Sequence, residues 1–275
     1  MICRTSVPTD VPRLRELWKT CFGDSDWYLD HFFHNAYRPE RALVLEAEGA
    51  VVSMLLTFPE TVVTAAGGTA PACYVYAFCT HPDSQGRGYG RTLLAWTEQR
   101  ARAEGCAAAL MVPGEESLFR FYRSLGYGVT LFHREVAWPQ NRLPITQPRL
   151  SPLSPAEYAG ERALWLAGTD RVDPTAETLV WQQSLCRCTG GDLYRLSDGV
   201  AAVEVWEDTA EVKELLCADP QSAAAAIAAA LGAAQVRLYL PAGLEVGEKV
   251  PFAVLKWLKP GLTLGPECYF AFGFD

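Results

Sequence analysis

The segment Thr80–Leu94, THPDSQGRGYGRTLL, limits most narrowly what this chain can fold into. An apolar run ends at His81–Pro82, a glycine-rich turn follows, and an amphipathic helix pattern starts near Arg91. The glycines at positions 86, 88 and 90 permit tight turns and bring several N–H groups together at the positive end of the helix. The pattern predicts a strand, loop and helix that cradle a pyrophosphate; a ligand-free glycine-rich connection is the alternative.

Two familiar phosphate-binding loops do not fit this segment. No Gly-Lys-Ser/Thr follows the glycines, so it is not a Walker loop. The GxGxG spacing, with no ribose-binding acid about 20 positions further on, also fails the dinucleotide fingerprint.

The flanking residues predict an α/β domain. Hydrophobic periodicity and turn signals indicate two short helices within residues 10–33, then four strands, and then alternating helices and strands. The strands are expected at 43–47, 51–58, 61–63 and 73–79, followed by helix 91–104, strand 107–112, helix 117–125 and strand 129–136.

Similar elements recur downstream in a similar order, which predicts a diverged second copy. Prolines repeat between Trp138 and Pro152 and mark a boundary. The expected elements are helices from Ser154 and from Asp173–Pro174, strands 193–197, 200–207 and 211–217, helix 221–231, strand 235–240 and an apolar closing strand 269–274.

Composition excludes several classes of protein. The 275 residues are 49% hydrophobic and 20% charged, which is enough apolar material for one large or two smaller domains. No apolar run approaches the roughly 18 residues of a membrane span, and the start lacks a signal-peptide core, so a soluble cytoplasmic protein is expected. The net charge of −8 argues against nucleic-acid and membrane partners. The nine cysteines form no CxxC pair, so we expect reduced thiols and no metal site.

Two motifs together resemble one family. Gln85-x-x-Gly88-x-Gly90 is similar to the Q/R-x-x-G-x-G/A loop of the GCN5-related N-acetyltransferases (GNAT superfamily), and Phe121–Tyr127, FYRSLGY, resembles their FYxxLGF segment. One helix and one strand separate the motifs, as that fold requires. The element order resembles the tandem-GNAT, enhanced-intracellular-survival (Eis-like) branch.

The resemblance implies an α/β (α+β) fold class with two tandem acyl-CoA N-acyltransferase folds. Mixed central sheets flanked by helices are expected, with a degenerate second copy. The implied domains are an acetyl-CoA-binding GNAT domain at 1–138, a proline-rich linker at 139–152 and a degenerate GNAT-like domain at 153–275.

Cofactor contacts follow from the resemblance position by position. The strand end is expected to pair with the pantetheine arm, the glycine loop to hold the pyrophosphate, and the second helix start to line the pantetheine and adenine. The family often carries asparagine where this chain has Glu115, so that contact departs from the pattern. The implied residues are Phe78, Cys79 and Thr80; Gln85, Gly86, Arg87, Gly88, Tyr89, Gly90 and Arg91; and Ser117 and Leu118.

Tyr122 is the predicted general acid, because a phenol beside the thioester sulfur can protonate the departing thiolate. A packed core tyrosine is the alternative reading, since Tyr122 shares a helix face with Leu118 and Leu125. A base or water must also deprotonate the amine. The candidates are Asp275, whose terminal carboxylate is the second predicted catalytic group, and Glu60, Tyr76 and His81.

The implied activity is direct transfer of an acetyl group from acetyl-CoA, as co-substrate, to a primary amine of a small molecule or peptide. Two alternatives remain: a non-catalytic acyl-CoA-binding module, and an acyltransferase with a different acyl donor. The sequence leaves open the acceptor, the acyl chain length, the role of the second domain and the oligomeric state.

Overall fold

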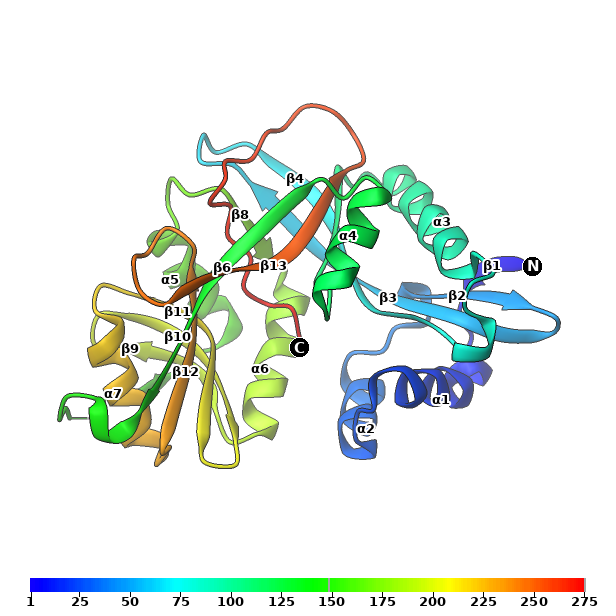
Figure 1. Ribbon diagram of the computed structural model, residues 1–275. Helices are drawn as coiled ribbons and strands as arrows, with labels where there is room; N and C mark the ends of the chain where they lie inside the picture. Colours follow the sequence, from blue (N-terminus) through cyan, green and yellow to red (C-terminus); the bar gives the residue numbers. More distant parts are fainter. Residues whose placement is uncertain (148, 275) are drawn as a thin grey trace. The chain divides into compact units, whose positions relative to one another are not determined.

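The computed structural model describes residues 1–147 and 149–274. The chain forms two compact units, each built from separate stretches of sequence. The first contains residues 1–60, 70–127 and 255–260; the second contains 61–69, 128–254 and the chain from residue 261 onward. Figure 1 labels helices and strands of both units.

The first unit is a sheet with helices on both faces. Its strand order is β1-β2-β3-β4-β5, in which β1 pairs antiparallel with β2, β2 antiparallel with β3, and β4 parallel with β5. The elements are β1 (Ile2–Thr5), α1 (Val11–Phe22), α2 (Asp26–Asn35), β2 (Ala42–Ala47), β3 (Ala50–Val63), β4 (Thr69–Thr80), α3 (Tyr89–Ala103), β5 (Ala108–Met111) and α4 (Glu116–Ser124).

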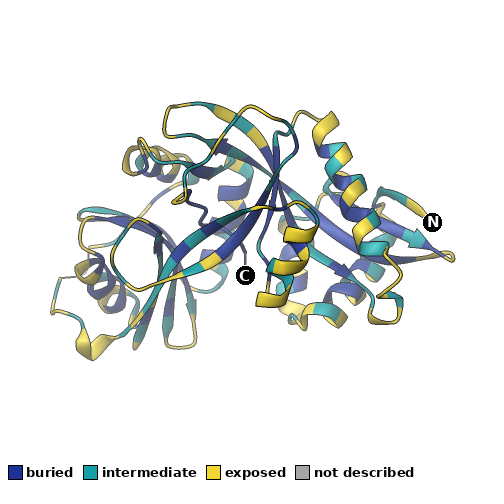
Figure 2. Cartoon of the chain, turned by 45° about the horizontal axis from the view of Figure 1, so that its top comes forward, coloured by how far each residue is buried: buried dark blue, intermediate teal, exposed yellow. Residues whose placement is uncertain are grey.

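Helices α1 and α2 lie on one face of the strands and α3 on the other (Figure 1). Trp18 of α1 is 1% exposed and packs its ring 4.7 Å from Phe32 of α2 and 5.5 Å from Tyr76 of β4. On the other face Leu93 and Leu94 of α3 are buried. Figure 2 shows the strands mainly buried and the outer faces of the helices exposed.

Two predictions about these strands are wrong in detail. Residues 51–58 and 61–63 are one strand, β3, which runs through Pro59. The pairing with β2 ends at Leu56, so the missing N–H of Pro59 breaks no bond to β2. The fourth antiparallel-type strand is instead β1, which is only four residues long and therefore shows no clear alternation. The predicted turn at Glu48–Gly49 is confirmed: both residues have positive φ, as the tightest hairpin turns require.

The second unit is also a mixed sheet with helices. Its strand order is β13-β6-β12-β11-β10-β9-β7, and β11 pairs parallel with β12. The elements are β6 (Val129–Pro139), β7 (Ser151–Pro152), α5 (Pro155–Trp165), β8 (Arg171–Pro174), α6 (Ala176–Cys188), β9 (Asp192–Leu196), β10 (Gly199–Trp206), β11 (Thr209–Cys217), α7 (Pro220–Leu231), β12 (Gln235–Pro241) and β13 (Glu248–Trp257), whose last residues belong to the first unit. Short 3-10 turns lie at Pro8–Asp10, Pro39–Arg41, Pro82–Ser84 and Gln140–Arg142.

Two predictions for this half differ from the structure, and one strand was not predicted. The helix expected from Asp173–Pro174 begins after Thr175, whose side chain caps it, because Arg171–Pro174 is strand β8. Residues 269–274 are buried but form no strand beyond an isolated bridge between Tyr269 and Arg171. Strand β13, which was not predicted, carries Pro251 and lacks a regular alternation.

Other signals hold. The capping box is confirmed: Ser154 Oγ accepts from Glu157 N at 3.3 Å, and Ser154 N donates to the Glu157 carboxylate at 2.9 Å. The segment predicted as a linker, 139–152, falls within the second unit, where Leu143 and Leu150 pack against the core; Pro148 of that segment lies outside the described residues.

A buried ionic cluster ties α5 to the sheet of the second unit. Arg162 Nε donates to the fully buried Glu214 of β11 at 3.0 Å, and the Tyr158 hydroxyl donates to the same carboxylate at 2.8 Å. Arg162 also pairs with Asp173 of β8. Because both charges are out of water, the pair must stay complete to be tolerated.

We therefore expect Glu214→Gln to lower the free energy of unfolding by about 3 kcal/mol, since it leaves a buried guanidinium without its main counter-charge. The control is Glu161→Gln, which breaks the exposed pair with Arg195 and should cost less than about 1 kcal/mol. The midpoints of urea unfolding measure both. Equal midpoint shifts would show that burial of the Arg162 pair is irrelevant to stability.

Candidate active site

The glycine loop forms the predicted connection between a strand and a helix. Gly86 and Gly88 have φ of 74° and 79°, a left-handed conformation that disfavours other residues, and Gly88 is the N-cap of α3. The N–H groups of the helix's first turn have no acceptor within the helix, and they carry the positive end of its dipole. The loop therefore offers an anion site made of backbone groups.

Gln85 and Gly90 fasten this loop to the end of β4. The Gln85 side chain donates its Nε2–H to the carbonyl of Thr80 at 3.2 Å. A Cβ at Gly90 would lie 3.1 Å from Thr80 Oγ1 and 3.3 Å from the Phe78 ring, so only glycine allows this close packing without a shift. The loop is thus held in place by side-chain packing as well as by chain connection.

The arginines of the loop are exposed and can reach an anion. Arg87 lies 3.8 Å from Glu48, but its side chain is 53% exposed, and a pair of this kind contributes little. Arg91, Tyr89 and Gly90 lie in the first turn of α3, where Arg91 is exposed and the other two are half-buried. Both guanidinium groups can therefore turn toward a phosphate.

Strand β4 outlasts its partner β5. The parallel pairing runs from Ala72 opposite Ala108 to Val75 opposite Met111, where β5 ends, while β4 continues to Thr80. Ala77, within this extension of β4, has φ of +46°, an unfavourable left-handed conformation for alanine. The edge of β4 after Val75 is consequently left without β5 as a partner.

Backbone alternation decides which groups face that open edge. The carbonyl of Cys79 accepts the Ser53 hydroxyl from β3 at 2.8 Å, and the next N–H on that side, from His81, donates to Val52 at 2.9 Å. Because neighbouring residues of a strand point their backbone groups to opposite edges, those of Phe78 and Thr80 face away from β3. Of the predicted pantetheine contacts, Phe78 and Thr80 thus present their backbone to the open edge, whereas that of Cys79 faces β3.

Tyr122 of α4 lies beside this edge. Its ring centroid is 6.4 Å from that of Phe78, and its side chain is 7% exposed. Burial, with a smaller contribution from Cys79, raises the pKa of its hydroxyl to about 12. Among the described residues no hydrogen-bond partner of the hydroxyl is found, so the group is available to a bound molecule.

Lys256 holds the helix that carries Tyr122. Its Nζ donates to Glu98 of α3 at 2.6 Å and to the carbonyl of Leu125 at 2.9 Å, directly after α4. Leu125 leads into Gly126, whose φ of +95° ends the helix. A cation at a helix C-terminus is favourable because it meets the negative end of the dipole. No sequence signal pointed to Lys256, because this contact joins residues far apart in the chain.

The other predicted site residues are dispersed. Ser117 is exposed at the start of α4 and bonds to Glu115, and Leu118 is half-buried. His81 accepts from Asp83 N through its Nδ1, as the cap of a short turn. Tyr76 is inside the aromatic cluster with its hydroxyl 2.7 Å from that of Tyr28. Asp275 lies outside the described residues.

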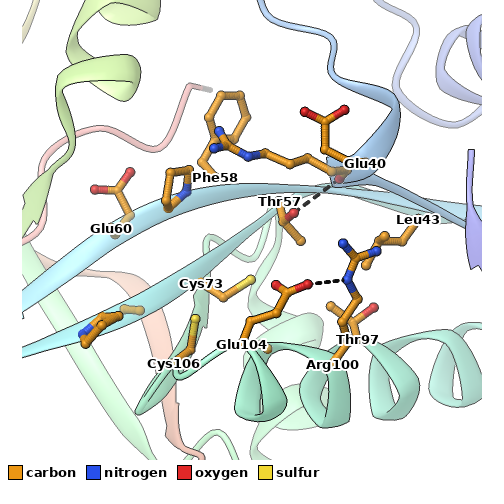
Figure 3. A pocket seen from close by; sticks show the side chains of 15 residues that line it. Glu40, Leu43, Thr57, Phe58, Glu60, Cys73, Thr97, Arg100, Glu104 and Cys106 are labelled. Atoms are coloured by element: carbon orange, nitrogen blue, oxygen red, sulfur yellow. Dashed lines mark hydrogen bonds and ion pairs between the residues drawn. The ribbon is translucent and has the colours of Figure 1, made fainter.

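Glu60 lines a separate cavity of about 280 Å³ between the strands and the C-terminal part of α3. Arg100 of α3 pairs with Glu104, the residue after that helix, at 2.7 Å. Figure 3 shows this pair below Thr57 of β3, with Cys73 and Cys106 at one side. No residue predicted to bind the cofactor lines this cavity. Glu60 therefore lies with the residues that line this cavity, which do not include Tyr122.

In the part of the chain that the structure describes, neither a metal-binding cluster nor a membrane-spanning helix is found. Within residues 1–147 and 149–274 no group of three or more His, Cys, Asp or Glu side chains is placed to hold a metal ion. None of the helices in that part of the chain has the length and apolar character needed to cross a bilayer.

Comparison with known proteins agrees with this geometry. Residues 3–130 match the family model described as an acetyltransferase (GNAT) domain. The resemblance to the GNAT superfamily that the two motifs indicated is thus confirmed for this segment of the chain. The sequence has no match among curated proteins.

The chain also shares its fold with solved acetyltransferases. Eis1 from Mycobacterium abscessus is 15% identical with a TM-score of 0.66, over 94% of this chain and 74% of that one. GCN5-related N-acetyltransferases from Anabaena variabilis (14% identical, TM-score 0.73, 94% and 73% covered) and Kribbella flavida (15%, 0.69, 93% and 70%) are similar. The predicted α/β fold class, with mixed sheets flanked by helices, is confirmed.

Replacing Lys256 should loosen α4. We expect Lys256→Met to lower the free energy of unfolding by about 1.5–3 kcal/mol, because two hydrogen bonds from a charged donor are lost and Glu98 stays half-buried without its cation. Lys259→Met, three positions on, is the control and should change little. Urea unfolding measures both, and equal stability of the two variants would contradict this role of Lys256.

Proposed function

We propose that the protein transfers an acetyl group from acetyl-CoA directly to a primary amine, with the chemistry in the first unit. One observation carries the proposal: the glycine loop, the unpaired end of β4 and the Tyr122 hydroxyl converge at one end of one sheet. Each suits a different part of the same cofactor.

The cofactor would bind largely through backbone groups. Its pyrophosphate would lie on residues Gly86–Arg91, and the amides of its pantetheine arm would pair with Phe78 and Thr80 as an added strand pairs with a sheet edge. The Thr80 carbonyl already accepts from Gln85, so its N–H is the freer partner. Ser117 and Leu118 remain proposed contacts for the pantetheine and adenine.

Tyr122 would serve the leaving thiolate. A phenol with a pKa near 12 stays protonated at neutral pH and is a weaker acid than an ordinary thiol, whose pKa is about 8.5. Full proton transfer to a solvated thiolate would therefore be uphill. The same apolar surroundings would raise the pKa of the CoA thiol. The Tyr122 hydroxyl would therefore assist best through a hydrogen bond that strengthens as negative charge develops on the sulfur.

The amine must lose a proton to attack. The terminal carboxylate of Asp275 stays a proposal for this role, and a water relay is the alternative. The acceptor itself is proposed only as an amine of a small molecule or peptide.

The second unit would be a degenerate copy without a cofactor site. At the start of α7, which corresponds to α3 in the element order, Asp219 Oδ1 accepts from Gln221 N at 3.1 Å and from Ser222 N at 3.2 Å. These bonds lower the pKa of Asp219 and keep it ionised. A fixed carboxylate thus occupies the helix end where a phosphate would bind. The proposed domains remain 1–138 and 153–275.

Two other functions would use the same site. A module that binds acyl-CoA without catalysis needs the loop and the β4 edge but not the Tyr122 hydroxyl. An enzyme with another acyl donor keeps all three and differs at the acyl end. Release of free CoA thiol in the presence of a panel of amines would distinguish the enzyme from the non-catalytic module. Competition among acyl donors would distinguish an acetyltransferase from an enzyme that uses another donor.

Gly88→Glu should abolish acetyl-CoA binding, because it places a carboxylate where the pyrophosphate would lie. The matched control is Gly67→Glu, since Gly67 has a similar φ of +85°, and neither glycine has an atom within 4 Å of the added Cβ. Isothermal titration calorimetry on both variants measures the effect. Wild-type affinity in Gly88→Glu would refute the loop assignment, and equal loss in both would show that strain alone is responsible.

Tyr122→Phe should lower turnover about 10²-fold or more with nearly unchanged CoA affinity, because the hydroxyl acts only as the thiolate develops. The control is Tyr127→Phe, which removes a neighbouring buried hydroxyl from the same motif. At temperatures at which this variant is folded, its turnover should equal that of the wild type.

The pH dependence of turnover tests whether Tyr122 keeps its proton during the reaction. Since the pKa of Tyr122 is raised to about 12, its proton is retained throughout the neutral and mildly alkaline range. Turnover of the wild type should therefore show no fall from phenol ionisation up to about pH 10. Normal turnover in Tyr122→Phe would make Tyr122 a packing residue.

A further inference from the structure

Cys21 and Cys79 bring two thiols together beside the proposed cofactor site. Cys21 lies in the last turn of α1 and Cys79 near the end of β4, and their side chains hydrogen bond to each other. Cys21 Sγ also lies 3.7 Å from the carbonyl oxygen of Thr80, the residue after Cys79. The pair is therefore a contact between α1 and β4, in addition to that of Trp18 with Tyr76.

Their position follows from strand alternation. Phe78 and Thr80 direct their side chains toward Gly90 of α3, so Cys79 between them points to the opposite face, where α1 lies. The pair consequently sits on the same short stretch of β4 that borders the open edge. Tyr122 is close enough for Cys79 to influence its hydroxyl.

Among the nine cysteines, all of which lie within the described residues, Cys21 is the one whose pKa is lowered. The hydrogen bond from Cys79, with the charge of Arg13, lowers the pKa of Cys21 to about 7, whereas burial is the main or a contributing cause of a raised pKa at each of the other eight thiols. Cys21 is partly exposed, Cys79 is 9% exposed. A partly exposed thiolate next to a second thiol is the arrangement of a nucleophilic and a resolving cysteine.

We propose that Cys21 and Cys79 are a redox modification site, at which a hydroperoxide converts the two thiols into a disulfide that ties α1 to β4. The Cys21 thiolate attacks the peroxide, so an S–O bond forms while the O–O bond breaks and the leaving oxygen takes a proton. Cys79 sulfur then attacks the sulfenic sulfur; the S–S bond forms, the S–O bond breaks, and water leaves with the Cys79 proton. Two thiols are oxidised and one hydroperoxide is reduced.

The bond would alter the acyl end of the site, a consequence that rests on the proposed function. Drawing Cys79 toward α1 must move its neighbours Phe78 and Thr80, which face the cofactor edge. Since displacements of about 1 Å cost up to about 10²-fold in rate, we expect oxidation to lower turnover about tenfold or more, reversibly with a thiol reductant.

The test begins with chemistry alone. The full chain is treated with hydrogen peroxide, blocked with N-ethylmaleimide and digested, and a peptide joining Cys21 to Cys79 is sought by mass spectrometry before and after dithiothreitol. Cys21→Ser should abolish the linked peptide. Cys79→Ser should leave a dimedone-reactive sulfenic acid at Cys21. Cys106→Ser, which changes a half-buried thiol with a raised pKa, should leave the linkage intact.

Linkage of Cys21 to another cysteine, or equal oxidation of all thiols, would overturn the proposal. CoA titration and turnover of the reduced and oxidised wild type then test the consequence. A disulfide that leaves both unchanged would refute its effect on the site. A reduced protein that binds no CoA would refute the proposed function. The disulfide would still be tested independently by the mass of the linked peptide.

Discussion

The parting of β4 and β5 after Val75 and Met111 is the constraint on which the first unit's chemistry depends. Backbone N–H and C=O groups at the edge of a sheet need partners, and a strand that outlasts its neighbour offers an unpaired row of them. Here the row is short, because β4 ends at Thr80, and it contains the left-handed Ala77. A conformation that costs on the order of 1–3 kcal/mol persists because the contacts of Ser53 and Gln85 hold the strand beyond it.

The same stretch of β4 divides its side chains between two faces. Phe78 and Thr80 support the glycine loop, since their atoms fill the space beside Gly90, and Cys79 meets α1. The loop, Tyr122 and the thiol pair therefore share one support. A change in the path of β4 over these residues reaches all of them, which makes this strand end the natural place for control of the site.

Local signals were sufficient where a residue's role depends on its neighbours in sequence. The loop at Gly86 and Gly88, the turn at Glu48–Gly49 and the capping box at Ser154 were all predicted, because each is set by φ preferences or by hydrogen bonds over a few residues. The short β1 and the proline-containing β13 were missed, because both gain their pairing from strands distant in sequence.

Contacts between remote residues lay beyond any such signal. Lys256 and Glu98 are 158 positions apart, and nothing near Lys256 in sequence indicates a helix C-terminus for it to bind. The meeting of Cys21 with Cys79 depends likewise on the packing of α1. Even the aromatic residues of α2 showed only apolar periodicity, which does not separate Phe32, 1% exposed, from Trp27, 45% exposed and stacked on His31.

The two helix starts show how one element can keep or lose a ligand. At α3 the N-cap is Gly88, which has no side chain, so the N–H groups of the first turn face outward without an internal acceptor. At α7 the N-cap is Asp219, whose carboxylate accepts two of those N–H groups and brings its own negative charge. An internal cap of this kind typically contributes about 1 kcal/mol to stability. A phosphate would have to displace it and would meet its charge at the same point. Gly88 gives up that stability and leaves the helix end open to an anion from outside, so the difference between a binding site and a structural turn is here the difference between glycine and aspartate at one position.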